Sequence, residues 1–456
     1  EQHYTDTLTA ACGLADPNAV WGMTQAASEL VRSLHHLGVQ FNVTDDDELD
    51  LRNFGGQKKK RTAFAQSDTG KQLMTALIDA VRREESAGTV ERFPHHKFRT
   101  LLLSGNICGG CTVQDTYTGE LLRFVCDAVL IATGGLHGLF GDTTGSLANT
   151  GEVTAELFRL GVPMANLEMI QYHPTTVELG EKRMLLSEAA RGEGGRLFAL
   201  RNGKPWYFME EKYPELGNLM PRDITAREVW TVSRDYEVFL DMTELPKEVM
   251  EHKLAGLVDD CQTYLHKDIR KEPIPILPGI HYFMGGIQVD ERHRTSMRNL
   301  YAAGECCAQY HGANRLGGNS LLGAIYGGQI AAETACRETV SSPNMPCAEE
   351  SLLPELSPDA QMQMNRILLN ALGVVRDAQT LEAGIQEIRK LSGTLPLLGC
   401  AMLESALARK ESRGAHWRAD YPQRNDAVYC KTTVAHWNGQ HIAISFESIP
   451  ERRHDL

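Results

Sequence analysis

Two apolar stretches that end in glycine turns constrain the fold of this chain more than any other feature of its sequence. They are Asp127-Ala-Val-Leu-Ile-Ala-Thr-Gly-Gly135 and Asn299-Leu-Tyr-Ala-Ala-Gly-Glu305. A buried strand that ends in glycine lets a dinucleotide approach the backbone, whose amides bind phosphate or ribitol oxygens. Either stretch alone is weak evidence, because any α/β protein contains strand-to-glycine turns. Together with a helix that begins at Ser320, they predict an α/β fold with a ligand beside the helix N-terminus.

The composition is that of a globular chain with room for about two to four domains. Of its 456 residues, 42% are apolar and 23% are charged. No apolar run approaches the roughly 20 residues that cross a bilayer, so we expect no membrane span. Lys and Arg number 46 against 59 Asp and Glu, a net charge of −13, and this balance argues against nucleic-acid binding, which needs a basic face.

The cysteines favour free thiols in a reducing compartment. There are 11 of them, without the regular spacing of a disulfide framework. Cys108-Gly-Gly-Cys111 lacks a second pair with matching spacing, so we expect structural cysteines there and no metal site. No cysteine cluster suits an iron–sulfur centre.

Hydrophobic periodicity places further elements along the chain. Apolar residues recur at helical spacing over 20–37, 70–84 and 150–160, and a short strand is expected over 39–43. The segments 112–117 and 121–125 flank a Thr-Gly-Glu turn and predict a hairpin. From about 163 to 278 the elements become shorter and more polar, which indicates an inserted domain, and 341–346 is typical of a linker.

Polar residues suited to binding a dianion occur in short segments among these elements. Arg binds carboxylates bidentately and His adds a directional donor, so three of each among glycines suit a site that clamps a dicarboxylate. Any one of these residues alone is more often a core or surface residue. The prediction of a dicarboxylate site depends on their joint occurrence. The segments are Gln171-Tyr-His-Pro-Thr175, Ser187-Glu188, Arg191-Gly-Glu-Gly-Gly195, Pro221-Arg222-Asp223, His281-Tyr-Phe-Met-Gly-Gly286 and 311–320.

With several others, these segments closely resemble the flavoprotein subunit family of fumarate reductase and succinate dehydrogenase. The resemblance spans nearly the whole chain in family order, and two of its segments run to eight or more residues. We interpret the last segment, 409–416, as structural or partner-facing. The further segments are Phe54-Gly-Gly56, Ala132-Thr-Gly-Gly135, Gly304-Glu-Cys306, 311–321 and Arg409-Lys-Glu-Ser-Arg-Gly-Ala-His416.

The resemblance implies a bound FAD and the interconversion of fumarate and succinate, with hydride exchange at flavin N5. In the family, the residues matching His173 and Ser187 hold one substrate carboxylate, and those matching His281 and Arg315 hold the other. The family usually has Thr at the position of Ser187, so the hydroxyl is kept. The residue matching Arg222 passes a proton to or from a substrate carbon.

In the family this proton is supplied through the positions that match Glu188 and Arg191. A guanidinium is not normally deprotonated. Arg222 would therefore serve only transiently, with Glu188 as the titratable relay. The catalytic residues that the resemblance implies are Arg222, Glu188, Arg191, His173 and His281.

Other positions match flavin contacts of the family. Glu152 stands where members commonly have Asp after Thr-Gly, which keeps the carboxylate and lengthens its reach. The implied cofactor-binding residues are Thr133, Gly134, Gly135, Glu152, Glu305, Arg315, Asn319, Ser320 and Leu321.

The predicted fold class is α/β, with a Rossmann-like FAD-binding domain, an inserted α+β capping domain and a carboxy-terminal helical domain. We expect the FAD-binding domain over 1–162 and 281–340, the capping domain over 163–280, the helical domain over 347–412, and a carboxy-terminal segment over 413–456. The family's glycine-rich amino-terminal strand–turn–helix, which grips the ADP half of FAD, and its nearby flavin-carrying His do not appear in this sequence. We expect them upstream of Glu1, the alternative being that the protein has lost them.

Electrons that reach FAD must pass to an acceptor, and the resemblance implies that this acceptor is an iron–sulfur subunit docked on a membrane anchor. We therefore expect a peripheral position at the cytoplasmic face of the cell membrane, held through partner subunits.

Three alternative functions stay open. The first is an L-aspartate oxidase, against which Met284 and the segment from Arg409 argue. The second is a self-contained haem fumarate reductase, for which no Cys-x-x-Cys-His motif appears, and the third is a non-catalytic scaffold subunit without flavin.

Overall fold

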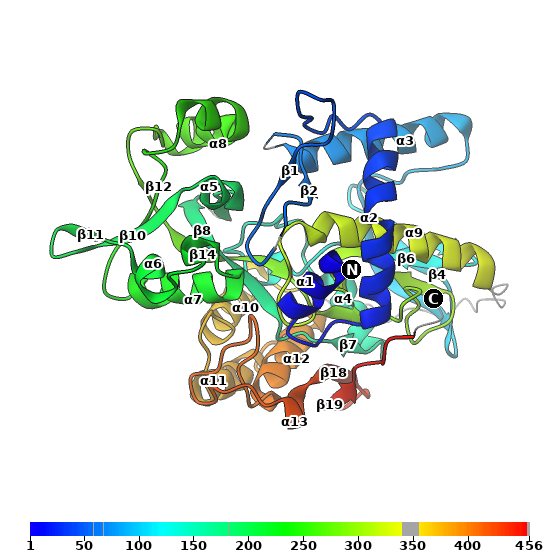
Figure 1. Ribbon diagram of the computed structural model, residues 1–456. Coiled ribbons are helices and arrows are strands. Elements are labelled where there is room, and N and C mark those ends of the chain that lie inside the picture. The colour runs from blue at the N-terminus through cyan, green and yellow to red at the C-terminus, as the bar shows by residue number, and fades with distance from the viewer. Residues whose placement is uncertain (58, 67, 181, 340–354, 454–456) are drawn as a thin grey trace.

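The computed structural model describes residues 1–456 except 58, 67, 181, 340–354 and 454–456, so the linker expected over 341–346 lies outside the described residues. Helices and sheets are mixed along the whole chain (Figure 1). The segment drawn in green forms a lobe on one side, the blue amino-terminal helices lie on the other, and the orange carboxy-terminal helices lie below.

The two strand–glycine stretches form neighbouring parallel strands. Strand β6 (Val129–Ile131) pairs with β16 (Leu300–Ala302), so the turns that follow them lie at the same edge. Gly134 and Gly304 have φ angles of 72° and 80°, a left-handed conformation that favours glycine. Helix α9 (Asn319–Glu338) follows and begins one residue before the predicted start.

The largest apolar core lies behind these strands and joins distant parts of the chain. Two sheets border it, an antiparallel one in the order β3-β4-β5 and a mostly antiparallel one in the order β17-β15-β7-β18-β19. The predicted hairpin is confirmed as the β4–β5 pair. The elements are β3 (His96–Ser104), β4 (Ile107–Asp115), β5 (Leu121–Val125), α4 (Glu152–Arg159), β7 (Met164–Ala165), β15 (Gly286–Gln288), β17 (Cys307–Ala308), α10 (Pro358–Ala371), α11 (Ala378–Ile388), α12 (Thr394–Ala408), β18 (Lys431–Trp437) and β19 (Ile442–Ser448).

A second apolar core belongs to the green lobe. It is built on a four-stranded sheet in the order β11-β10-β12-β13, and a three-stranded sheet in the order β14-β8-β9 connects the lobe to the first core. The elements are β8 (Ile170–Leu179), β9 (Lys182–Leu185), α5 (Glu188–Gly192), β10 (Arg196–Arg201), β11 (Lys204–Trp206), α6 (Phe208–Lys212), α7 (Arg222–Ser233), β12 (Val238–Asp241), α8 (Ala255–Asp260), β13 (Ile274–Pro275) and β14 (Leu277–Phe283).

The amino-terminal region differs from the prediction at one element. The strand expected over 39–43 is wrong, because Val43 forms only an isolated bridge with Leu49. Val39 and Phe41 are instead buried against two helices, so their alternation reflects packing and not a ladder. The elements of this region are α1 (Gln2–Ala10), α2 (Pro17–His36), β1 (Leu51–Arg52), β2 (Thr62–Ala63) and α3 (Thr69–Ala87).

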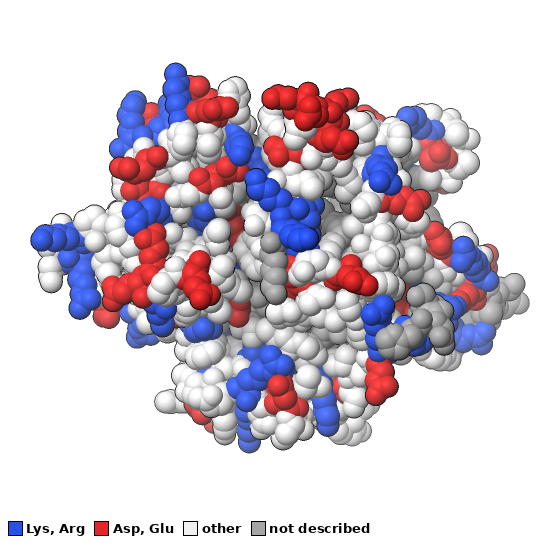
Figure 2. Space-filling view, viewed as in Figure 1, with Lys and Arg blue, Asp and Glu red and all other residues white. Residues whose placement is uncertain are grey.

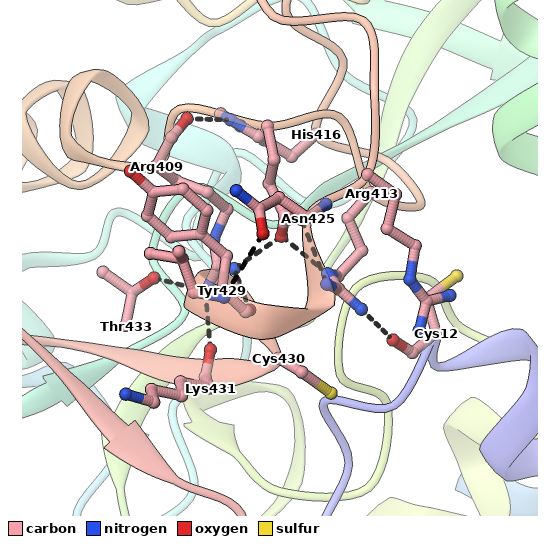
Figure 3. Close-up of polar contacts among 12 residues, drawn as sticks. Cys12, Arg409, Arg413, His416, Asn425, Tyr429, Cys430, Lys431 and Thr433 are labelled. Carbon is pink, nitrogen blue, oxygen red and sulfur yellow. Dashed lines mark hydrogen bonds and ion pairs between the residues drawn. The ribbon is translucent and has the colours of Figure 1, made fainter.

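A buried ion-pair network attaches the carboxy-terminal segment to the rest of the chain, and Figure 3 shows several of its members. Arg409 donates to Glu168 Oε1 at 2.7 Å and to Glu411 Oε1 at 2.9 Å, and none of these side chains is exposed. Arg413 donates to Glu411 at 2.6 Å and to the carbonyl oxygen of Cys12 at 2.7 Å. This burial supports the structural interpretation of 409–416. The short helix α13 (Asp426–Tyr429) lies in the same region.

Three remote parts of the chain meet at Ala313, just before the predicted substrate residue Arg315. The N–H of Ala313 donates to the carbonyl of Ala11 at 3.0 Å, and its carbonyl accepts from the N–H of Ala415 at 2.8 Å. A Cβ at Gly414 would lie 2.5 Å from the carbonyl oxygen of Ala313. Both ends of the chain therefore fix the loop that precedes α9.

The surface carries charges of both signs, interspersed over the face that Figure 2 shows. The loop after α2 is exposed and strongly acidic over Asp45, Asp46, Asp47 and Glu48. Within the described ranges, no helix combines the length and the apolar character needed to cross a bilayer.

Candidate active site

The residues predicted to clamp a dicarboxylate come together from separate elements. His173 lies on β8 and His281 on β14, and the antiparallel register pairs His173 with Gly279. The two imidazole rings meet edge to face, with centroids 5.2 Å apart and an interplanar angle of 66°. Arg222 begins α7, which packs on both strands. Arg315 lies in the loop before α9, and the positive charges of Arg222 and Arg315 both lower the pKa of His281.

Glu188 and Arg222 form a buried ion pair at the centre of this cluster. Arg222 donates from Nε and from Nη2 to Glu188 Oε2 at 2.7 and 2.5 Å. The other carboxylate oxygen accepts from the N–H of Gly55 at 2.9 Å and lies 3.6 Å from Nη2 of Arg191. Burial alone would raise the pKa of Glu188, but Arg222 and Arg191 outweigh burial and lower the pKa to about 2. Glu188 is therefore ionised at neutral pH.

Both histidines are held neutral. Burial, together with the positive charge of Arg222, lowers the pKa of His173 and of His281 well below the usual value. Each ring thus carries one N–H donor. Thr144 Oγ1 lies 2.9 Å from Nδ1 of His281. Nε2 of His173 is buried and has no hydrogen-bond partner among the described residues, as expected of an atom that binds a ligand.

Arg315 also keeps unused hydrogen-bonding capacity. Its Nε is buried without a partner in the described part of the chain, and its guanidinium lies 4.5 Å from the ring centroid of Tyr282. Burial and the charge of Arg222 lower its pKa to about 9, which leaves it protonated at neutral pH. Three buried guanidiniums, those of Arg191, Arg222 and Arg315, thus lie near one buried carboxylate, and the excess of two positive charges (3 − 1) suits a dianion.

Ser187 lies beside this cluster as the N-cap of α5. Its side-chain oxygen accepts from the N–H of Ala189 at 3.2 Å, and its hydroxyl donates to no acceptor in the part of the chain that the structure describes. Its role at a substrate carboxylate stays a prediction.

The predicted cofactor residues after β6 and β16 also touch one another. Glu305 accepts from the N–H of Phe283 at 2.9 Å and lies 3.3 Å from Nε2 of His137. A Cβ at Gly135 would come within 2.7 Å of Glu305 Oε1. Thr133, by contrast, is exposed at the end of β6. An exposed backbone beside a turn that tolerates only glycine fits the close approach of a dinucleotide such as FAD.

Asn319, Ser320 and Leu321 begin α9 at the same edge. The side chain of Asn319 is held by α1, because it donates to Thr7 Oγ1 at 2.9 Å and pairs with Nε2 of His3 at 2.9 Å. Leu321 is 42% exposed although its helix is long and central. The free N–H groups of the first turn of α9 can meet the negatively charged edge of a flavin.

Glu152 is placed differently from the other predicted cofactor residues. It begins α4, and its carboxylate forms an ion pair with Lys97 at 2.9 Å, which also contacts Glu355. Its charge is therefore already compensated, and a flavin contact at this position stays a prediction.

Substituting Ala for Gly135 is expected to lower the flavin content of the purified protein, because the added Cβ would displace Glu305 and Phe283 from the cofactor edge. Flavin released by denaturation and counted per chain is the measurement. Gly328→Ala in α9 is the matched control, since a Cβ there meets nothing within 4 Å. Full flavin content in the Gly135 variant would show that the turn does not approach the cofactor.

Some residues of the site received no role from the sequence. Gln171 was part of a recognised segment, but its contact with Arg222 Nη1 at 3.1 Å was not predicted. It stands two residues before His173, and the strand period of two was the available signal. Nδ2 of Asn314 donates a hydrogen bond to Oδ1 of Asp223 at 3.0 Å, and nothing in the local sequence indicated that contact.

Comparisons with known proteins identify the family of this chain. The family described as FAD binding domain matches residues 1–321, and the family described as fumarate reductase flavoprotein C-term matches 392–453. A succinate dehydrogenase flavoprotein subunit of Bacillus subtilis is 36% identical over 98% of this chain and 85% of its own length. A fumarate reductase flavoprotein subunit of Mycobacterium tuberculosis is 32% identical, covering 96% and 85%. An L-aspartate oxidase of Streptomyces coelicolor is 30% identical, covering 99% and 84%.

Among solved structures, an E. coli quinol fumarate reductase matches with a TM-score of 0.88 and 26% identity, covering 98% of this chain and 86% of that chain. The predicted α/β fold, the family resemblance and the FAD cofactor are thereby confirmed. The chain belongs to the flavoprotein subunit family of succinate dehydrogenase and fumarate reductase and is an FAD-dependent oxidoreductase.

Proposed function

We propose that this protein interconverts fumarate and succinate. The observation that carries the proposal is the buried cluster of two neutral imidazoles and three guanidiniums around the ionised carboxylate of Glu188. A four-carbon dicarboxylate supplies the two negative charges that this cluster lacks. FAD, when bound, supplies the hydride chemistry.

In the proposed mechanism, two pairs of residues hold the substrate carboxylates. His173 and Ser187 donate to one, and His281 and Arg315 donate to the other. Neutral imidazoles can donate without adding to the positive charge already present on the arginines. Holding both ends fixes the reacting carbons and polarises the double bond, and such positioning removes much of the barrier.

Arg222 is proposed to transfer the proton. Its guanidinium gives an Nη proton to the substrate carbon during fumarate reduction and takes it back during succinate oxidation. Glu188 contacts two of its N–H groups and Arg191 lies on the far side of Glu188. Glu188 is ionised and can take up a proton that arrives from the side of Arg191 and pass it on to Arg222, so that Arg222 is deprotonated only transiently.

Electron exchange is proposed to involve an iron–sulfur subunit and quinone, with this chain peripheral to the cytoplasmic face of the cell membrane through anchor subunits. The structural similarity to a quinol fumarate reductase supports this assembly. We also propose the domain arrangement stated above, with residues 163–280 as the capping domain over the site.

L-aspartate oxidase is the second candidate, because one relative with that name is 30% identical over nearly the whole chain. The decisive experiment gives the flavin-loaded protein fumarate with a reduced viologen, succinate with a dye acceptor, and L-aspartate with oxygen. Turnover of fumarate and succinate without aspartate turnover is the expected result. Aspartate turnover alone would overturn the proposal. A protein without flavin absorbance would instead point to the scaffold alternative.

Replacing His281 by Ala is expected to raise KM for fumarate by about 10–100-fold, the loss of one hydrogen bond to a charged group. Steady-state kinetics per bound flavin measures the change. His36→Ala, at an exposed position on α2, is the control and should leave KM unchanged. An unchanged KM in the His281 variant would remove this residue from the substrate clamp.

A further inference from the structure

A chain of hydrogen bonds leads away from Arg222 on the side opposite Glu188. Nη1 of Arg222 donates to Gln171 Oε1 at 3.1 Å. Nε2 of Gln171 donates to Asn314 Oδ1 at 2.8 Å, and Nδ2 of Asn314 donates to Asp223 Oδ1 at 3.0 Å. Asp223 follows Arg222 in the sequence, so the backbone between them closes the chain of four side chains, which we call the Asp223 relay.

The direction of every bond in the Asp223 relay is fixed by acceptors that cannot reverse. Gln171 Nε2 also donates to the backbone carbonyl of Arg315 at 2.8 Å, and a carbonyl only accepts. At the other end, burial raises the pKa of Asp223, and its Oδ1 accepts from the amide nitrogen of Asn314. Both ends therefore require that Gln171 present its oxygen to Arg222.

This arrangement determines which N–H groups of Arg222 are left for a substrate. A guanidinium has five N–H groups. Glu188 takes one from Nε and one from Nη2, and Gln171 takes one from Nη1. Two remain (5 − 3), one on each terminal nitrogen, and contacts on two edges of the planar group hold them in one orientation.

We propose that Asp223 and Asn314 are positioning residues that orient Arg222 through Gln171. The inference rests on the proposed function, because it takes Arg222 as the proton donor. Since Gln171 also binds the carbonyl of Arg315, the relay sets the proton donor relative to one of the arginines that holds the substrate. Neither Asp223 nor Asn314 needs to touch the substrate.

The test is a set of substitutions that reverse or restore the direction of the relay. Asn314→Asp places a second carboxylate against Asp223, so one of the two must move or take a proton. In the double variant Asn314→Asp with Asp223→Asn, the new amide donates to the new carboxylate, which still accepts from Gln171. The bond from Gln171 then keeps its original direction and the net charge is restored, although the bond between positions 314 and 223 now runs the other way. Asp223→Asn alone can still accept from Asn314 through its amide oxygen.

The readouts are kcat per bound flavin and the solvent deuterium isotope effect on kcat. Asn314→Asp is expected to lower kcat by about 100-fold, the effect of a misplaced catalytic group, and to raise the isotope effect because proton transfer becomes limiting. Asp223→Asn is expected to lower kcat by no more than about fivefold. The double variant is expected to return to the level of Asp223→Asn. A purely structural role would lower flavin content or thermal midpoint and leave the isotope effect unchanged.

Two further variants keep the outcome decisive. Asp223→Leu removes the final acceptor without adding charge and is expected to lower kcat by about tenfold. This variant replaces Asn314→Asp as the test if Asn314→Asp does not fold. Glu228→Gln is the matched control, a buried carboxylate on the same helix bonded to Lys212 and outside the relay, and should leave kcat unchanged. Either of two results would overturn the positioning inference and leave the proposed function standing. One is an unchanged kcat in both the Asn314→Asp and the Asp223→Leu variants. The other is a double variant as slow as Asn314→Asp. An unsubstituted protein that turns over neither fumarate nor succinate would overturn the proposed function, and the inference with it.

Discussion

Replacing Arg222 by Gln is expected to lower kcat for fumarate reduction by about 10³-fold, the range of a general acid. Gln keeps a polar group at the position but has no proton to give to carbon. The substrate carboxylates are held mainly by other residues, so KM should change by less than about tenfold. The measurement is single-substrate kinetics with a reduced viologen, normalised to bound flavin.

The control for this substitution is Arg234→Gln at the end of the same helix α7. Arg234 lies over the ring of Trp230 at 5.0 Å and is far along the helix from the site. Its variant should keep the activity of the unsubstituted protein. Retention of more than about one tenth of kcat in the Arg222 variant would rule out Arg222 as the main proton donor.

Replacing Glu411 by Leu is expected to destabilise the protein by about 3–5 kcal/mol, the cost of leaving buried charges without their partner. Glu411 accepts from Arg409 at 2.9 Å and from Arg413 at 2.6 Å, and all three side chains are fully buried. Leu can accept from neither guanidinium. The N–H of Asn425, which donates to Glu411 at 2.8 Å, also loses its acceptor.

Urea unfolding of the flavin-loaded protein, followed by tryptophan fluorescence, measures this loss. Glu333→Leu is the control, because Glu333 forms an exposed i,i+4 pair with Arg337 on α9 and such pairs contribute at most about 1 kcal/mol. Equal unfolding midpoints for the two variants would mean that the buried network contributes little to stability.

The sequence was sufficient for the elements whose pattern is local. The strand–glycine stretches became β6 and β16, and the helix expected to begin at Ser320 is observed as Asn319–Glu338. The strand expected over 39–43 failed because alternating apolar residues also arise where a coil packs on helices, as Val39 and Phe41 do. Hydrophobic periodicity alone cannot distinguish a strand from a coil that packs on helices, because it does not show which elements the apolar residues contact.

For the site, the sequence identified residue types, and the structure supplied their contacts. The pairing of Glu188 with Arg222 follows from the position of α5 against α7, which no local pattern encodes. The same holds for Asn314 and Asp223, which belong to segments far apart in the chain. Contacts of this kind depend on the register between elements, and a family resemblance conveys them only where it assigns the residue a role.

The meeting of Ala11, Ala313 and Ala415 has a consequence for how the protein is made. During synthesis the ribosome releases the first of these residues long before the last. The loop with Arg315 cannot acquire its final hydrogen bonds until Ala415 has emerged. Contacts between such distant residues form slowly, because the intervening chain must first be closed into a loop. A nascent chain stalled before Ala415 would already contain every side chain proposed to touch the substrate, yet would lack one of the bonds that hold Arg315 in place.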